Sequence, residues 1–126
     1  SKDFSYYVIT IKVPFDADPN RVGGAMRDAA ATLLEDPEFK PHILEPLEFF
    51  GVDAWEPGTL VMKARIKTVP LKQWSVGREL RKRIAKVFVQ RGISVRIPEM
   101  HLHLDGTVIG ASRAGEAGRA DGASGE

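Results

Sequence analysis

The chain has 126 residues, which is the length of one domain, and 43% of them are hydrophobic, enough for one core. It contains no cysteine, which excludes a disulfide scaffold, a thiolate metal site and a cysteine nucleophile. The formal net charge of +1 argues against a dedicated nucleic-acid binder held by bulk electrostatics. No apolar run approaches the roughly 18 residues that a membrane span needs.

The small net charge conceals an asymmetry along the chain. Residues 1–60 carry five basic and eleven acidic side chains, whereas residues 61–96 carry eleven basic side chains and one acid, Glu79. Residues 97–126 are acidic again, with two basic and five acidic side chains. A domain with an acidic part and a basic part can associate with itself or with a foreign partner, and solvated faces explain the pattern as well.

The first half predicts a strand, a helix and a second strand. Residues 6–13 alternate in polarity, which predicts a strand that Pro14 ends. Asp18-Pro19 predicts a helix start, with Asp as N-cap and Pro at the first helical position. Residues 47–55 predict a strand that is irregular at its start, because Pro46 cannot donate to a ladder. The helix should bury one apolar stripe: Val22, Met26, Ala29, Ala30, Leu33 and Leu34.

The second half predicts a strand over residues 59–69, a helix over residues 72–91 and a short extended segment over residues 93–97. Gly92 is the natural C-terminal stop of the helix. In the strand, Leu60, Met62, Ala64 and Ile66 should face the core, and Val61, Lys63, Arg65 and Lys67 should face water. The core-facing side of the helix should hold Trp74, Gly77, Leu80, Ile84, Val87 and Phe88.

The predicted order is β-α-β-β-α-β with an additional C-terminal strand at residues 100–104. This order predicts an α+β fold of the ferredoxin-like type, in which two helices cover one face of an antiparallel sheet. The domain should therefore span residues 1–104. Residues 105–126 are half Gly and Ala, and no large apolar residue follows Ile109. We expect this segment to be a disordered tail, because it cannot bury enough surface to offset its ordering entropy.

Candidate chemistry is sparse. His101 and His103 alternate on one strand and could approach one metal ion, but two histidines are an incomplete ligand set and His42 is the only other one. Alternating polar residues on a half-exposed strand explain them as well. Four acids, Glu45, Glu48, Asp53 and Glu56, could perform acid–base work or could simply be the exposed residues of a strand and turn. We assign no catalytic, cofactor-binding or metal-binding residue.

A basic face is predicted on the sheet, formed by Lys12, Lys63, Arg65 and Lys67. On a ferredoxin-like fold the open sheet face is where RNA-recognition domains bind single strands, and those domains stack bases on aromatic side chains. The outward positions of the strand over residues 59–69 offer no aromatic residue. The alternative interpretation is a solvated basic face, which could also line a space.

The segment from Gln73 to Ile84, followed by Gly92-Ile93, resembles the C-terminal cytoplasmic domain of small-conductance mechanosensitive (MscS-type) channels. Residues 13–18 resemble the start of that family's first helix, and residues 50–67 resemble its strand pair. The resemblance covers roughly residues 6–104. Arg96 replaces a family proline, and residues 41–47 are not family-like. The residues that carry the motif are Trp74, Val76, Glu79, Leu80, Ile84, Gly92, Ile93 and Pro98.

The resemblance implies a soluble excerpt of a membrane protein whose transmembrane helices precede it, on the cytoplasmic side of a bacterial inner membrane. The domain would form part of a sevenfold cytoplasmic cage through which ions and small solutes reach a pore that opens under membrane tension, without gating that pore itself. It would need no cofactor and no nucleic acid. The resemblance also implies an oligomerisation strand that joins the copies: Met100, His101, Leu102, His103 and Leu104.

Two other functions compete with the channel domain. One is a ferredoxin-like nucleic-acid-binding module that uses Lys63, Arg65 and Lys67. The other is an enzyme or small-molecule-binding domain of the same fold, which would require a pocket with convergent polar groups.

Overall fold

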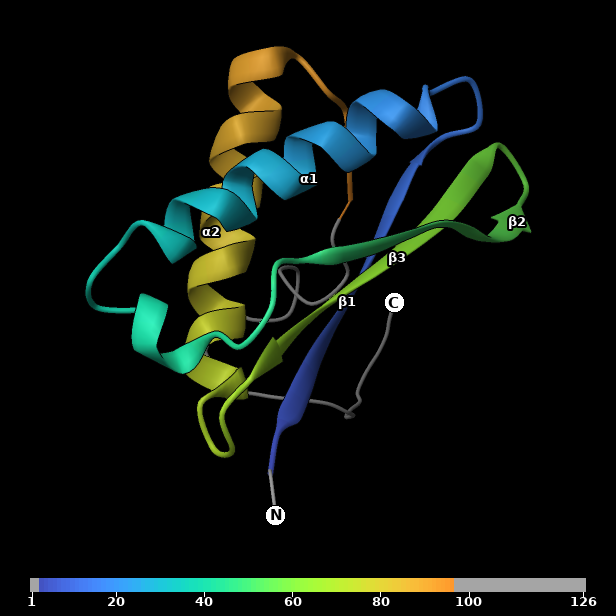
Figure 1. Cartoon of the computed structure of the whole chain (residues 1–126). Coiled ribbons are helices and arrows are strands. Elements are labelled where there is room, and N and C mark those ends of the chain that lie inside the picture. The colour runs from blue at the N-terminus through green and yellow to red at the C-terminus, as the bar shows by residue number, and fades with distance from the viewer. Residues whose placement is uncertain (1–2, 97–126) are drawn as a thin grey trace, which may run out of the picture. The chain divides into compact units, whose positions relative to one another are not determined.

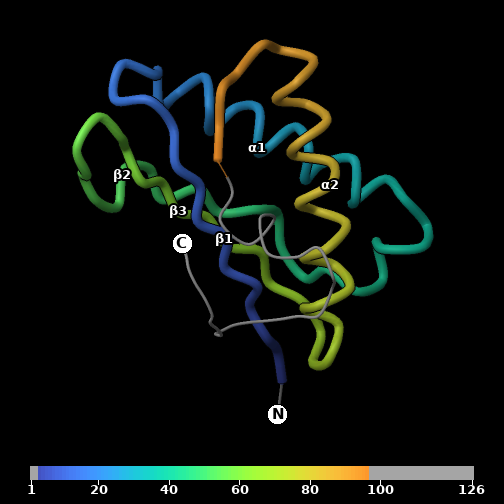
Figure 2. The backbone as a smooth tube through the Cα atoms, turned by 180° about the vertical axis from the view of Figure 1, so that it is seen from behind, coloured from blue at the N-terminus to red at the C-terminus, as the bar shows by residue number. Residues whose placement is uncertain are grey.

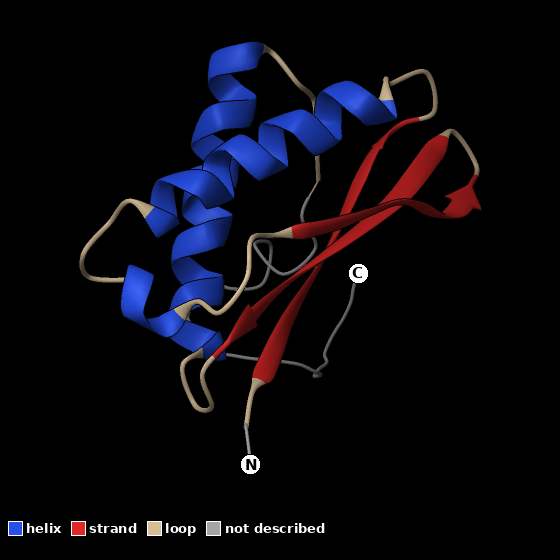
Figure 3. Ribbon diagram, viewed as in Figure 1, coloured by secondary structure: helices blue, strands red, loops and turns tan. Residues whose placement is uncertain are grey.

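The computed structural model of the chain describes residues 3–96. In this part of the chain two helices cover one face of a three-stranded sheet, which gives two layers (Figure 1, Figure 3). This arrangement confirms the predicted α+β fold. The elements are β1 (Ser5–Pro14), α1 (Pro19–Leu34), η1 (Lys40–His42, a short 3₁₀ helix), β2 (Glu48–Glu56), β3 (Thr59–Thr68) and α2 (Gln73–Arg91).

The sheet is antiparallel, with strand order β1-β3-β2. The central strand β3 pairs with β1 along its whole length, from Ser5 opposite Thr68 to Pro14 opposite Thr59. The predicted inward positions of β3 are all buried. Val61, which we expected to face water, is only 6% exposed. It is correctly placed on the outer face of the strand, but the neighbours on both sides of a central strand cover a small apolar side chain.

The edge strand β2 is irregular within its length rather than at its start. Its register against β3 shifts between Phe49 and Gly51 and again between Val52 and Ala54. Each shift leaves one extra residue on β2, as in a β-bulge. Gly51 lies at φ +87°, where a side chain would be strained. The strand therefore bends, which the proline-based prediction did not anticipate.

The helix α1 begins as the sequence predicts. The Asp18 side chain accepts a hydrogen bond from the Asn20 backbone N–H at 2.9 Å, and Pro19 stands in the first turn. Gly23 lies directly under the Phe49 ring, since a Cβ built on Gly23 would come within 2.7 Å of it. The predicted stripe is buried except for Leu34, which is half-buried.

The helix α2 packs on the sheet through Val76, Gly77, Leu80, Ile84 and Phe88, and Val87 is half-buried. It ends where Gly92 adopts the left-handed conformation, as predicted.

Trp74 is the exception, because 61% of it is exposed although the helical spacing placed it on the core side. Its ring meets the Tyr7 ring of β1 edge-on, with 6.4 Å between the centroids.

After α2 the chain returns to the free edge of β1, which Figure 2 shows from behind. Lys12 and Arg96 exchange two backbone hydrogen bonds of 2.7 Å each. The extended segment predicted at residues 93–97 is thus one antiparallel bridge within the described residues. The next hydrogen-bonding position toward the C-terminal end of β1 in this register is Pro14. Proline has no backbone N–H, so a continuous ladder is not available on that side.

The predicted strand at residues 100–104, the tail at residues 105–126 and the motif residue Pro98 lie outside the described residues. Over residues 3–96, neither helix combines the length and the apolar character that crossing a membrane requires.

Candidate functional site

The outer face of the sheet, away from the helices, carries a ladder of four ion pairs. Each of the four predicted basic residues holds one of the four acids that the sequence singled out. The nitrogen–oxygen distances are 3.2 Å for Lys12–Glu56, 3.6 Å for Lys63–Asp53, 2.8 Å for Arg65–Glu48 and 3.4 Å for Lys67–Glu45. We call this set the ion-pair ladder.

The strand order produces the ladder. Alternation along β3 turns Lys63, Arg65 and Lys67 to the outer face, and the register sets Arg65 directly opposite Glu48. Cross-strand neighbours on one face are close enough for side chains of opposite charge to pair. The bulges in β2 bring its acids into reach along the whole length of β3. The predicted basic face is therefore a mixed and locally neutral face.

Aromatic rings lie among these charges. The Arg65 guanidinium lies over the Tyr6 ring at 4.0 Å and over the Phe50 ring at 5.3 Å from its centroid. The Lys67 ammonium lies 4.2 Å from the centroid of the Phe4 ring. These rings come from β2, from β1 and from the residue before β1. The sequence of residues 59–69, from which the absence of aromatic side chains was predicted, does not contain them. Arg65 and Lys67 are thus each held by a carboxylate and by at least one ring, which restricts their side chains.

The pairing also affects protonation. The hydrogen bond from Arg65 to Glu48 raises the pKa of the Arg65 guanidinium above its ordinary value. Exposed pairs of this kind stabilise a fold only slightly, so the ladder fixes the orientation of side chains more than it adds stability. A phosphate group would have to displace a carboxylate at each cation in order to bind there.

A second polar cluster, which the sequence did not reveal, is centred on Arg83 of α2. Its guanidinium donates to Glu79 at 2.9 Å, to Asp36 at 2.6 Å and to the Thr32 hydroxyl at 3.1 Å. The hydrogen bond from Arg83 holds the pKa of the Asp36 carboxyl below its usual range, and it does the same for Glu79. This cluster joins α2 to the end of α1 and to the segment that leads to β2.

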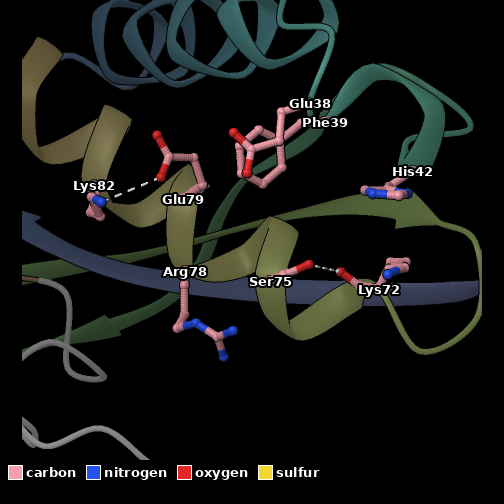
Figure 4. A pocket seen from close by; sticks show the side chains of 8 residues that line it. All are labelled: Glu38, Phe39, His42, Lys72, Ser75, Arg78, Glu79 and Lys82. Carbon is pink, nitrogen blue, oxygen red and sulfur yellow. Dashed lines mark hydrogen bonds and ion pairs between the residues drawn. The ribbon is translucent and has the colours of Figure 1, made fainter.

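An open groove of about 420 Å³ lies beside that cluster, between the η1 segment and the first turns of α2 (Figure 4). Its lining holds two carboxylates, Glu38 and Glu79, and three cations, of which Lys82 pairs with Glu79 at 3.4 Å. Lys72 and Arg78 have no ion-pair partner within residues 3–96. The lining residues are Glu38, Phe39, His42, Lys72, Ser75, Arg78, Glu79 and Lys82.

The motif residues have mainly structural positions. Val76, Leu80, Ile84 and Ile93 are buried in the core. As described above, Glu79 pairs with Arg83, Gly92 ends α2, and Trp74 is exposed. Among the described residues no group of three His, Cys, Asp or Glu side chains could hold a metal ion. The residues predicted to form the oligomerisation strand, from Met100 to Leu104, lie outside the described residues.

Comparison with known proteins identifies the family. The family model described as "Mechanosensitive ion channel MscS, C-terminal" matches residues 7–95, and the chain belongs to this family. It is 26% identical over 98 residues to the small-conductance mechanosensitive channel of Caldanaerobacter subterraneus subsp. tengcongensis, which covers 78% of the chain and 34% of that channel. It is 29% identical over 76 residues to the moderate conductance mechanosensitive channel YbiO of Escherichia coli K12, a match that covers 60% of the chain and 10% of that channel. The chain therefore spans about a third of one relative and a tenth of the other.

Proposed function

We propose that this domain serves the assembly of a mechanosensitive channel and shapes the cytoplasmic space through which ions and small solutes reach its pore. The match over residues 7–95 is the observation that carries the proposal, because it covers the whole sheet and both helices except the ends. The full protein would release ions and solutes under membrane tension. The domain itself would act in assembly and solute access rather than in gating.

The proposed assembly is a homo-oligomer, a heptamer in the full channel, on the cytoplasmic side of a bacterial inner membrane. Met100, Leu102 and Leu104 form an apolar alternation in the sequence, and a strand with one apolar face favours closure against copies of itself. In this role the ion-pair ladder gives the sheet a face without excess charge. Nothing in the comparisons favours the nucleic-acid alternative.

Substitution of Leu102 and Leu104 by Lys tests the strand role. We expect the wild-type chain to be monomeric when dilute and to associate as concentration rises, because one short strand buries little area. Leu102→Lys with Leu104→Lys should abolish this association and leave the melting temperature nearly unchanged. Light scattering over a concentration series measures the first effect and thermal unfolding the second.

The matched control replaces His101 and His103, which lie on the opposite face of the same predicted strand. His101→Lys with His103→Lys adds the same charge and should leave association nearly intact. If the leucine variant unfolds the domain, the strand belongs to the core of the single chain and the proposed assembly role is wrong. In a tension-gated channel that contains this domain, the leucine variant should also reduce survival of a hypo-osmotic shock.

A further inference from the structure

Leu71 combines an unusual backbone conformation with an exposed apolar side chain. It is the one non-glycine residue within residues 3–96 that has a positive φ, at 72°. It occupies the third position of a turn that the Lys72 N–H closes on the Val69 carbonyl at 3.2 Å, a position that favours Gly or Asn. The Leu71 side chain is nevertheless 84% exposed, so packing inside the domain does not explain it.

The surroundings of Leu71 form an apolar patch with positive charge, which we call the basic end and define as Leu71, Lys72, Trp74 and Arg78. Trp74 follows Leu71 by three residues, in the first turn of α2, and is 61% exposed. Lys72 and Arg78 are exposed and have no ion-pair partner among the described residues. In Figure 4 the Arg78 guanidinium points away from the Glu79–Lys82 pair. This end of the sheet thus offers two large apolar side chains beside two uncompensated cations.

The opposite end of the sheet carries the complementary set, which we call the acidic end: Phe15, Asp16, Asp18 and Trp55. Phe15 is 64% exposed and Trp55 is 75% exposed. The Phe15 N–H donates to the Gly58 carbonyl at 3.1 Å, which places Phe15 at the β2–β3 turn. Trp55 is at the same turn, opposite Leu60. Asp16 is exposed without an ion-pair partner among residues 3–96, and Asp18 caps α1.

The ten residues of β1 separate the two ends by roughly 30 Å, at about 3.3 Å a residue. Figure 1 shows the β1–α1 loop and the β2–β3 turn at one end of the sheet, and the β3–α2 loop at the other. One copy therefore cannot bring its own two ends together. Contact between them requires a second copy.

We infer that the basic end of one copy contacts the acidic end of a second copy, which rests on the proposed function of the domain in assembly. Opposite charges favour this pairing, whereas two basic ends would repel each other. Each end carries one exposed tryptophan, Trp74 or Trp55, and tryptophan is among the residues that most often anchor protein interfaces. A contact between unlike ends can repeat from copy to copy, giving a ring where the rotation between copies closes and a filament where it does not, whereas a contact between like ends stops at a dimer.

The available area makes the contact weak. Four large apolar side chains, partly exposed, contribute at most several hundred Å², below the roughly 1,200 Å² of a stable interface. The end contact should thus add to the strand contact rather than replace it. Its weakness also means that one substitution at either end should be enough to shift the association equilibrium.

Leu71→Gly separates an interface role from a structural one. Glycine relieves the positive φ and removes the exposed side chain, so the melting temperature should stay the same or rise. The association constant measured by sedimentation equilibrium should fall by about tenfold or more, as for an interface anchor. Val89→Ser is the matched control, since Val89 is 81% exposed but belongs to neither end, and it should change neither quantity.

A mixing experiment tests the pairing of unlike ends. A basic-end variant (Leu71→Gly, Lys72→Glu) and an acidic-end variant (Phe15→Ser, Trp55→Ser) should each associate with itself more weakly than the wild type, because only the strand contact is left. An equimolar mixture should associate more strongly than either variant alone, because one intact end of each kind remains. A mixture that associates no more strongly than its components, or a Leu71→Gly chain that associates like the wild type, would overturn the inference. In either case the Leu102 and Leu104 variant still tests the strand role separately.

Discussion

Gly77 is where the packing of α2 on the sheet allows the least change. A Cβ built on Gly77 would lie 2.4 Å from Cε1, 2.5 Å from Cδ1 and 2.6 Å from Cζ of Tyr7. The Tyr7 ring has little freedom to move, because it is only 6% exposed, accepts a hydrogen bond from Arg81 and meets Trp74 edge-on. Gly77→Ala should therefore force a shift of α2 or of the ring.

The two energetic effects of Gly77→Ala have opposite signs. Overpacking of a filled core costs about 1–3 kcal/mol. Alanine in place of glycine in a helix interior stabilises by up to about 1 kcal/mol. Because the overlap falls on a ring rather than on the end of a flexible side chain, we expect a net loss of about 1–2 kcal/mol. For a domain of this size each kcal/mol lowers the melting temperature by roughly 4–8 °C.

Urea denaturation followed by circular dichroism measures this loss. Gly24→Ala on α1 is the control, because no atom lies within 4 Å of the added Cβ and only the helix preference should act, in the stabilising direction. In a Tyr7→Val background the ring is absent, so Gly77→Ala should change sign and stabilise. Equal stabilisation by both alanine substitutions in the wild-type background would refute the close approach.

Two further predictions concern α2. Leu80 is fully buried, whereas the Lys82 side chain is 74% exposed. In denaturant unfolding, Leu80→Ala should therefore lower the free energy of unfolding by about 2–5 kcal/mol and Lys82→Ala by less than about 0.5 kcal/mol. Equal losses would mean that the faces of α2 are misassigned. Because Arg83 lowers the pKa of Asp36 in the folded state, the stabilisation is present above the ordinary carboxyl pKa of about 4 and disappears as pH falls through the lowered value. Asp36→Asn should therefore destabilise the domain more at pH 6 than at acidic pH, and an equal loss at both would show that the charge of Asp36 has no part in the effect.

The sequence predicted both helices and the long strands closely, because their signals are local. Alternation marks β1 and β3, and Asp18 and Gly92 mark helix ends by their backbone chemistry. The family resemblance, based on motifs in the right order, was also confirmed. The features that the sequence did not reveal depend on which residues of neighbouring strands stand opposite each other. The ion-pair ladder requires the two bulges of β2, and no local pattern announces a bulge such as that at Phe50.

The exposed side chains were predicted least well. Helical spacing places Trp74 with Leu80 and Ile84, but Trp74 lies in the first turn of α2 and is 61% exposed, and spacing carries no information about where a neighbouring layer ends. The Arg83 cluster joins residues 47 positions apart, so only the crossing of the helices reveals it. The assembly strand from Met100 to Leu104 stays a prediction.

The ion-pair ladder has a consequence for how the chain folds. Its acids belong to the acidic half of the sequence and three of its cations to the basic half, so the two halves attract one another before any core forms. If β2 slipped by one residue, its side chains would change faces and Glu48 would turn from Arg65 toward the helices. The pairs thus penalise wrong registers more than they stabilise the correct one. Salt, which screens charges beyond about 8–10 Å, should slow the search for the hairpin while leaving the unfolding rate of the finished domain nearly constant.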